Sequence, residues 1–273
     1  MDEKKWAEAH HCAAIYSAEW LAADGYDIIF VKADPFPPYD LAARHTQRLI
    51  IAAISFEIDG VGIWGRSEEQ LSKLLDVAAD NEAVACVCHV KMDATNKVRN
   101  ISLINWQTGL AYDWRNDDKH DVDGVEIGPH ELMWNGIGYV VSKTESYGFK
   151  VLWINWAYAD IPSIIVEEAD GKSVAILVRC ARRPLKIAPI CPISLRSAVS
   201  WAGKHNLPLE IVSVGQVSVN DPFDPAFDDE STTSHLVVPL YRGVSVFASI
   251  DGPYEVGEYP GHLQEDISSL RCH

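Results

Sequence analysis

Long apolar runs are missing from this sequence. The longest, such as residues 49–54 and 173–178, fall far short of the roughly 20 residues that a membrane-spanning helix needs. The chain opens with Met-Asp-Glu-Lys-Lys-Trp, which has neither the apolar stretch nor the small-residue cleavage site of a signal peptide. We therefore expect a soluble, cytoplasmic protein with no membrane partner.

Cysteine is also scarce, because six residues scattered over the chain are too few for a disulfide framework. Cys86 and Cys88 lie two apart on an expected strand, but no second Cys or His pair stands at zinc-ligand spacing. We expect buried, reduced thiols and no metal at these positions. Phosphate-binding Walker loops, the dinucleotide fingerprint and the Gly-x-Ser-x-Gly elbow are missing as well.

Basic residues are few. The 273 residues include 23 Lys and Arg against 39 Asp and Glu, which gives a formal net charge of -16. Proteins that bind nucleic acid concentrate Lys and Arg, because binding is driven by the release of counterions from phosphate. The one basic cluster (Arg179, Arg182, Arg183 and Lys186) is small. The net charge disfavours nucleic acid as a partner and suits a basic protein partner instead.

What the sequence does contain is an α/β pattern, and the pattern occurs twice. The first half predicts a helix that ends at Asp24-Gly25, a strand, a hairpin, a second helix and two further strands. These elements are expected over residues 5–24, 26–31, 41–44, 49–55, 67–80, 84–90 and 101–106. The second half repeats the order over residues 132–147, 149–155, 164–167, 173–180, 195–205 and 209–214.

The spacing repeats together with the order. Gly25 lies 15 residues before Asp40, and Gly148 lies 15 residues before Ser163. Glu8 and Glu131 each lie 17 residues before those two glycines. We therefore predict two tandem modules, residues 1–115 and 128–273, joined by a polar linker over residues 116–127.

The module resembles the restriction-endonuclease-like superfamily, the PD-(D/E)XK nucleases. The first half, from Gly-Tyr-Asp at residues 25–27 through Pro-Tyr-Asp-Leu at residues 38–41, is closest in rhythm to the Holliday-junction resolvases. The second half is similar to uncharacterised bacterial proteins of that fold, on the strength of residues 175–184, residues 211–215 and a late hairpin over residues 239–251. The resemblance implies two αβββαβ modules, which would pack as a pseudo-dimer because superfamily members commonly dimerise.

The resemblance also implies a particular chemistry. These nucleases hold Mg²⁺ with an Asp at the start of the hairpin and with a Glu, Asp or Gln on the next strand, and a Lys two residues further on positions the attacking water. A Glu on the first helix often completes the site. The ion needs converging carboxylates and stabilises the attacking and leaving oxygens during phosphodiester cleavage.

In the first module Asp40 stands at the Asp position and Glu8 at the helix position, but Ala52 and Ile54 replace the strand Glu and Lys. Alanine cannot bind Mg²⁺, and isoleucine cannot orient water.

In the second module Glu131 is present, Ser163 replaces the Asp, Leu177 replaces the Glu and Arg179 stands for the Lys. Glu8, Asp40, Glu131 and Arg179 are therefore vestigial catalytic candidates, and no cofactor is expected.

The surviving residues allow sharper interpretations. Glu8, His11 and Asp40 would form a migrated metal site if another acid, such as Glu57 or Asp59, joined them; alternatively Glu8 and Asp40 are relics, and His10 and His11 lie on a solvated helix face. Arg179, Arg182 and Arg183 would contact phosphate, or would pair with the abundant acids. The acidic segment 221–230 is a loop, or a docking element with Phe223 and Phe227 as apolar anchors.

Three functional hypotheses are consistent with these residues. The first is a non-catalytic protein of duplicated nuclease fold that acts through protein–protein contact, for example as an immunity or inhibitor protein for a basic nuclease. The second is a divalent-metal-dependent nuclease with a rearranged site, which would need Mg²⁺. The third is a non-cleaving nucleic-acid binder that uses the three arginines.

Overall fold

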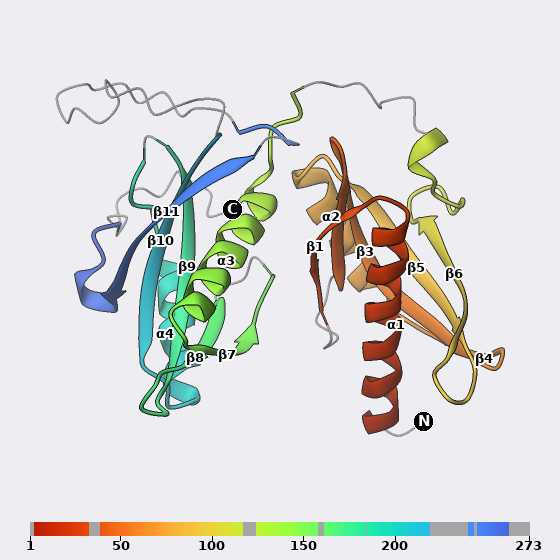
Figure 1. Cartoon of the computed structure of the whole chain (residues 1–273), viewed down its shortest axis with the longest axis horizontal. Coiled ribbons are helices and arrows are strands. Elements are labelled where there is room, and N and C mark those ends of the chain that lie inside the picture. Colours follow the sequence, from red (N-terminus) through yellow and green to blue (C-terminus); the bar gives the residue numbers. More distant parts are fainter. Residues whose placement is uncertain are drawn as a thin grey trace. The chain divides into compact units, whose positions relative to one another are not determined.

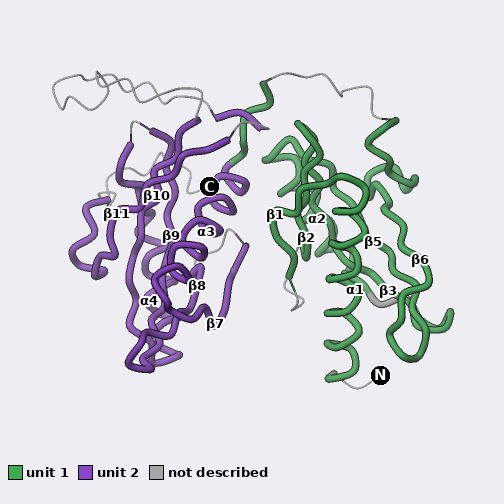
Figure 2. The backbone as a smooth tube through the Cα atoms, in the orientation of Figure 1, with its two compact units in different colours: residues 1–128 green, residues 129–273 purple. Residues whose placement is uncertain are grey.

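The computed structural model describes residues 3–32, 39–116, 124–157, 161–183, 185–218, 240–242 and 245–261. The chain divides into two compact units, residues 1–128 and residues 129–273 (Figure 2). Each unit contains one sheet and two helices, so the α/β fold class is confirmed. None of the helices in the described residues is both long and apolar enough to cross a membrane.

Unit 1 is built around a six-stranded mixed sheet (Figure 1). The strands follow the order β1-β2-β3-β5-β6. The remaining strand, β4, pairs with the last residues of β3, beyond the part that pairs with β2. Only β3 and β5 are parallel, because α2 connects them. The elements are α1 (Glu3–Ala23), β1 (Asp27–Val31), β2 (Leu41–His45), β3 (Arg48–Ile58), β4 (Val61–Trp64), α2 (Glu68–Asp80), β5 (Val84–Met92), β6 (Val98–Asn105) and the 3-10 turn η1 (Trp114–Asn116).

Small residues let α1 lie close to the sheet. Ala9, Ala13 and Ala14 recur at helical spacing and are fully buried against strand residues such as Ile54 and Phe56. At the start of α2, Ser67 and Gln70 bond each other's backbone N–H groups, which is the capping box.

Unit 2 has a five-stranded sheet in the order β11-β10-β9-β8-β7, with β9 and β10 parallel. The helix α3 has a glycine, Gly136, where it passes β9. A Cβ at this position would lie 2.1 Å from the Cys180 sulfur, so a larger residue would not fit. The elements are α3 (Pro129–Ser146), β7 (Lys150–Ile154), β8 (Ile164–Glu167), β9 (Ser173–Arg182), α4 (Pro192–Lys204), β10 (Leu209–Ser218), β11 (Val246–Glu255) and the 3-10 turn η3 (Val256–Glu258).

One backbone hydrogen bond at the start of the hairpin has a counterpart in the other unit. The Asp40 N–H donates to the Ala52 carbonyl at 2.9 Å, and the Ser163 N–H donates to the Ile176 carbonyl at 2.8 Å. Each first helix ends at a glycine with a positive φ, +91° at Gly25 and +85° at Gly148. The predicted order of helices and strands is thus found in both units.

Several expectations need correction. The strand β4, which follows a turn at Asp59-Gly60, is an addition to the predicted elements. Of the late hairpin expected over residues 239–251, the described residues include the strand β11, which pairs with β10, and the rest falls partly outside the described residues. Cys86 and Cys88 are free, buried thiols as expected, but Cys191 is disulfide-bonded.

Candidate functional site: two neutralised carboxylates

Asp40 lies where β3 changes its antiparallel partner. β3 pairs with β2 up to Ala52 and with β4 from Phe56 onward. Between these two pairings the Ile54 N–H has no strand opposite it, and the Asp40 carboxylate accepts its hydrogen bond at 2.8 Å. The side chain therefore completes the hydrogen bonding of the sheet edge, which explains why a polar residue is buried there.

Arg66 supplies the positive charge beside Asp40. The Asp40 side chain is fully buried, that of Arg66 is 8 % exposed, and the guanidinium Nη2 donates to the carboxylate Oδ1. The His10 Nε2 lies 3.4 Å from the same oxygen and is also buried. A guanidinium thus lies against the oxygen that a metal ion would need.

Lys32 adds a second cation to this centre. Burial lowers the pKa of its ammonium to about 8, while the Asp40 carboxylate opposes that shift and Arg66 adds to it. The Lys32 Nζ lies 5.4 Å from the centre of the Tyr39 ring. Two cations around one carboxylate make a poor place for a divalent cation, because the local charge is already positive.

The predicted partners of Asp40 lie elsewhere. Glu8 and His11 are exposed on α1, so the structure does not gather Glu8, His11 and Asp40 at one buried centre. The helix residue beside Asp40 is His10, which was expected on a solvated face. The signal was present, because His10 lies three and four residues before Ala13 and Ala14, which are buried.

The two other acids considered for a migrated site have partners of their own. Glu57 lies 3.2 Å from Lys91 and 3.6 Å from His89, and Asp59 lies 3.5 Å from Arg99. Across the described ranges, three or more His, Cys, Asp and Glu residues nowhere form a group that could hold a metal ion. The acidic segment 221–230 lies outside the described residues.

Unit 2 places Ser163 at the position of Asp40. Its hydroxyl accepts a hydrogen bond from the Val178 N–H at 3.1 Å, as Asp40 does from Ile54. The residues that correspond to Ala52 and Ile54 are therefore Ile176 and Val178, and the assignment to Leu177 and Arg179 was one residue too far along β9. Both residues remain apolar, so the strand still carries no metal ligand.

Glu131 of α3 is also neutralised by an arginine. Its carboxylate accepts a hydrogen bond from the Arg242 Nε at 2.7 Å, and the exposed fractions of the two side chains are 0 % and 1 %. Arg242 lies 111 residues further along the chain but in the same unit. Both units thus bury one carboxylate from the predicted site, and an arginine of the same unit binds it.

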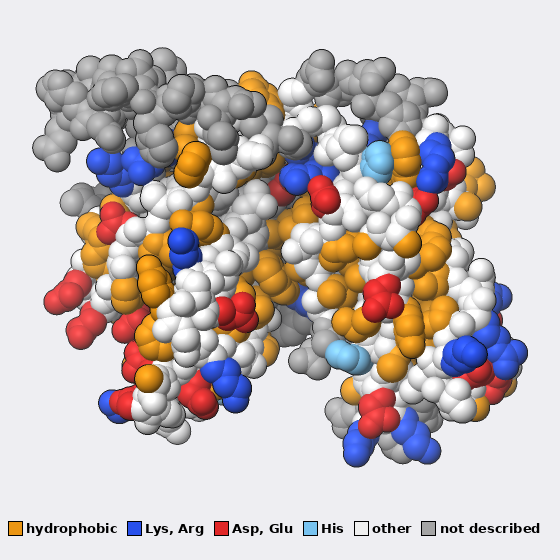
Figure 3. All heavy atoms as spheres, viewed as in Figure 1, with side chains coloured by type: hydrophobic (Ala, Val, Ile, Leu, Met, Phe, Trp, Pro, Cys, Tyr) orange, Lys and Arg blue, Asp and Glu red, His pale blue; other side chains and the backbone are white. Residues whose placement is uncertain are grey.

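Arg179 and Arg182 of β9 do not form one surface with Arg183, which follows the strand. Side chains alternate along a strand, so Arg179 and Arg182, which are three residues apart, project from opposite faces. Burial lowers the pKa of Arg182. The Arg183 Nη2 donates to the Ser249 hydroxyl of β11 at 3.1 Å. On the face shown in Figure 3, basic side chains likewise occur in small separate groups.

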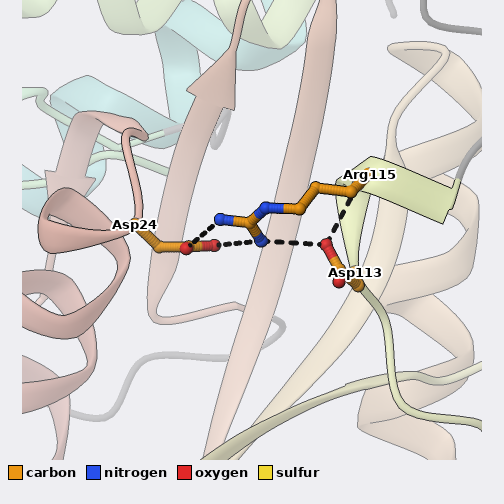
Figure 4. Close-up of polar contacts among 3 residues, drawn as sticks. All are labelled: Asp24, Asp113 and Arg115. Atoms are coloured by element: carbon orange, nitrogen blue, oxygen red, sulfur yellow. Dashed lines mark hydrogen bonds and ion pairs between the residues drawn. The ribbon is translucent and has the colours of Figure 1, made fainter.

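An exposed cluster of ion pairs joins η1 to the turn that follows α1 (Figure 4). The Arg115 Nη1 donates to Asp24 at 3.2 Å and to Asp113 at 3.0 Å, and Arg115 lowers the pKa of Asp24. The Trp114 ring stacks on His45 with 3.6 Å between ring centres. This cluster fixes η1 against the turn that follows α1.

The geometry of the Asp40 and Glu131 centres supports charge neutralisation better than it supports metal catalysis. Comparisons with protein-family models, curated proteins and solved structures found no match to this chain.

Proposed function

We propose that the chain is a tandem duplication of one nuclease-like module, that both metal centres are silent, and that it acts through contact with a protein partner. One observation carries the proposal: in each unit one carboxylate at a metal-ligand position, Asp40 in unit 1 and Glu131 in unit 2, is buried against an arginine of its own unit. A guanidinium in that place replaces the metal electrostatically, but it cannot generate a hydroxide nucleophile.

The duplication is supported by the matched hydrogen bonds of Asp40 and Ser163 and by the shared strand order of the two sheets. Two unrelated domains would have no reason to share both. If the units pack as nuclease protomers do, the duplication provides a pseudo-dimer within one chain.

The partner that fits best is a basic protein. A net charge of -16 attracts a positively charged surface and speeds its encounter, whereas it repels a nucleic acid. A nuclease that must bind nucleic acid carries such a surface, so an immunity or inhibitor role against a basic nuclease is consistent with the charge.

The first experiment is calorimetric titration of Mg²⁺ and Mn²⁺ into the intact protein, together with incubation of the protein with mixed DNA and RNA substrates. We expect neither metal binding nor cleavage. The matched variant is Arg66→Met, which frees the Asp40 carboxylate; we expect it to remain inactive because Ala52 and Ile54 supply no further ligand. Cleavage by the wild type that disappears in Asp40→Ala would refute the proposal and would establish a metal-dependent nuclease.

The partner is tested separately with a panel of purified basic nucleases as probes. We expect one of them to bind and to lose activity, with an association rate that falls as the salt concentration rises. Binding that is independent of salt would contradict the role assigned to charge.

A further inference from the structure

A polar row crosses β3 and β5 on the face of the unit 1 sheet that lies opposite Asp40. Ser55 pairs directly with His89, and Glu57 pairs directly with Lys91. Ile54 and Phe56 pack in the core with α1, so side-chain alternation places Ser55 and Glu57 on the other face. This row is therefore separate from the carboxylate–arginine centre, and its chemistry does not depend on the proposed function.

The row lies at the carboxyl ends of the two parallel strands of the sheet. Exposure increases toward these ends: Ala53 is 1 % and Ser55 is 8 % exposed, whereas the side chains of His89, Glu57 and Lys91 are 14 %, 17 % and 49 % exposed. In open α/β sheets the carboxyl ends of parallel strands are the usual place for a ligand.

The distances define a directed chain of contacts. The Ser55 Oγ lies 3.0 Å from the His89 Nδ1, and the His89 Nε2 lies 3.6 Å from the Glu57 Oε2. Lys91 holds the other carboxylate oxygen of Glu57 at 3.2 Å. With the ring proton on Nε2, facing Glu57, the Nδ1 lone pair is free to accept the serine proton. This is the arrangement of nucleophile, base and orienting acid.

Unit 2 covers the equivalent place. Because Ile54 corresponds to Val178, and β5 runs beside β3 as β10 runs beside β9, the residues at the positions of Ser55 and His89 are Arg179 and Ser213. Ser213 is fully buried, and its hydroxyl accepts a hydrogen bond from the Ala188 N–H at 2.8 Å. The chain between β9 and α4 thus closes this face in unit 2, whereas in unit 1 the chain between β3 and α2 forms β4 along the edge of β3.

We infer that Ser55 is a nucleophile that accepts an acyl group from a carboxylic ester. The Ser55 oxygen forms a bond to the ester carbonyl carbon and transfers its proton to the His89 Nδ1. The bond from that carbon to the alkoxy oxygen breaks, and the leaving alcohol takes the proton from His89. Water then attacks the acyl-serine and gives its proton to His89, which returns it to Ser55 as the carboxylic acid leaves.

The test is labelling of the intact protein with an alkyl fluorophosphonate, followed by intact-mass measurement and peptide mapping. We expect one adduct, at Ser55, formed with loss of fluoride. Ser55→Ala should abolish it, and His89→Gln should slow it by about 100-fold or more, the usual contribution of a general base.

The matched control is Ser102→Ala. Ser102 of β6 pairs with His89 from the other side, but it makes no hydrogen bond to that ring among the described residues. Its loss should leave labelling unchanged. Hydrolysis of p-nitrophenyl acetate provides the second readout, with an initial burst of one equivalent of nitrophenol that Ser55→Ala removes.

A wild-type protein that gives no Ser55 adduct would overturn the inference. So would labelling at Ser55 that His89→Gln leaves unchanged. Either result would reduce the row to cross-strand polar pairs that stabilise the sheet. Circular dichroism and the urea midpoint of each variant show that a lost adduct does not reflect lost folding.

Discussion

Asp40 and Ser163 each lie directly before the first strand of a hairpin, a position called the corner of the sheet below. Both side chains accept a hydrogen bond from a backbone N–H of the second strand, but Asp40 is an acid and Ser163 is neutral. Asp40 binds the Ile54 N–H at 2.8 Å and also needs Arg66, because a buried carboxylate without a cation is costly. Ser163 binds the Val178 N–H at 3.1 Å with a neutral hydroxyl. The corner therefore requires an acceptor and not an acid, and the charge in unit 1 is an additional feature that its surroundings must balance.

The helix acids show the opposite distribution. Glu131 of unit 2 is fully buried against Arg242, whereas Glu8, at the matching distance before its helix-ending glycine, is exposed. Each unit thus has one buried acid at a position of the predicted site, in a different place, and a different arginine binds it. Two kinds of substitution test how far each acid depends on its arginine. One removes a single partner, and the other places the residue found in one unit at the matching position of the other unit.

The largest effect is expected in unit 2 from Arg242→Met. The change leaves the Glu131 carboxylate buried without its cation, which should lower the free energy of unfolding by about 3–5 kcal/mol. Urea denaturation followed by circular dichroism measures the loss. The double variant Arg242→Met with Glu131→Gln should regain most of the lost stability, since a neutral amide needs no cation. If Arg242→Met alone lies within about 1 kcal/mol of wild type, the pair contributes little to stability.

The next largest effect is expected when the serine of unit 2 is placed at the matching position of unit 1. Asp40→Ser keeps an acceptor for the Ile54 N–H but leaves Arg66 buried, and it should cost about 3 kcal/mol. Asp40→Ser with Arg66→Met should lie within about 1 kcal/mol of wild type, so the coupling in a double-mutant cycle should be at least about 2 kcal/mol. Additive losses would show that Arg66 does not depend on Asp40.

Lys32→Asn should change how stability depends on pH. Asn155 is the corresponding residue of unit 2, because Lys32 and Asn155 both donate their N–H groups, at 2.7 Å, to the corner residue's carbonyl. The pKa of folded Lys32, about 8, lies below the ordinary 10.5, so between these values the unfolded chain binds a proton that the folded chain does not. Over this window Lys32 loses its burial penalty and wild-type stability increases with pH.

The variant lacks that increase. Its stability relative to wild type should therefore fall by about 2 kcal/mol between pH 8 and pH 9.5. Urea midpoints at the two pH values measure the difference. A constant difference would mean that Lys32 does not change its charge in this window.

The smallest effect is expected from Ser163→Ala. The buried Val178 N–H loses its acceptor, which should cost about 1–2 kcal/mol in the same urea assay. Ser200→Ala, on the exposed side of α4, is the matched control and should change stability by less than about 0.5 kcal/mol. Equal effects of the two changes would show that the hydroxyl of Ser163 is dispensable.

The sequence was sufficient for the element order apart from β4, because helix-ending glycines and hairpin turns leave local signals. The second hairpin is one residue longer than the first, since Leu41 pairs with Ala52, eleven positions on, and Ile164 pairs with Ile176, twelve positions on. Local pattern does not give this length, and the assignment to Leu177 lies one residue beyond the matching position. Arg66 could not have been assigned to Asp40 from local pattern, since the pair spans 26 residues. Tertiary packing decides such partners.

The Arg115 cluster has a mechanical consequence. Arg115 and Trp114 fasten η1 to Asp24 and His45, near the end of α1 and the end of β2. A force that pulls on the chain after Asn116 would act on the contacts of η1 first and on the strand β6 only after these contacts had broken. In a stretching experiment the first yield of unit 1 should therefore be the release of η1, and the edge strand should peel away only afterwards.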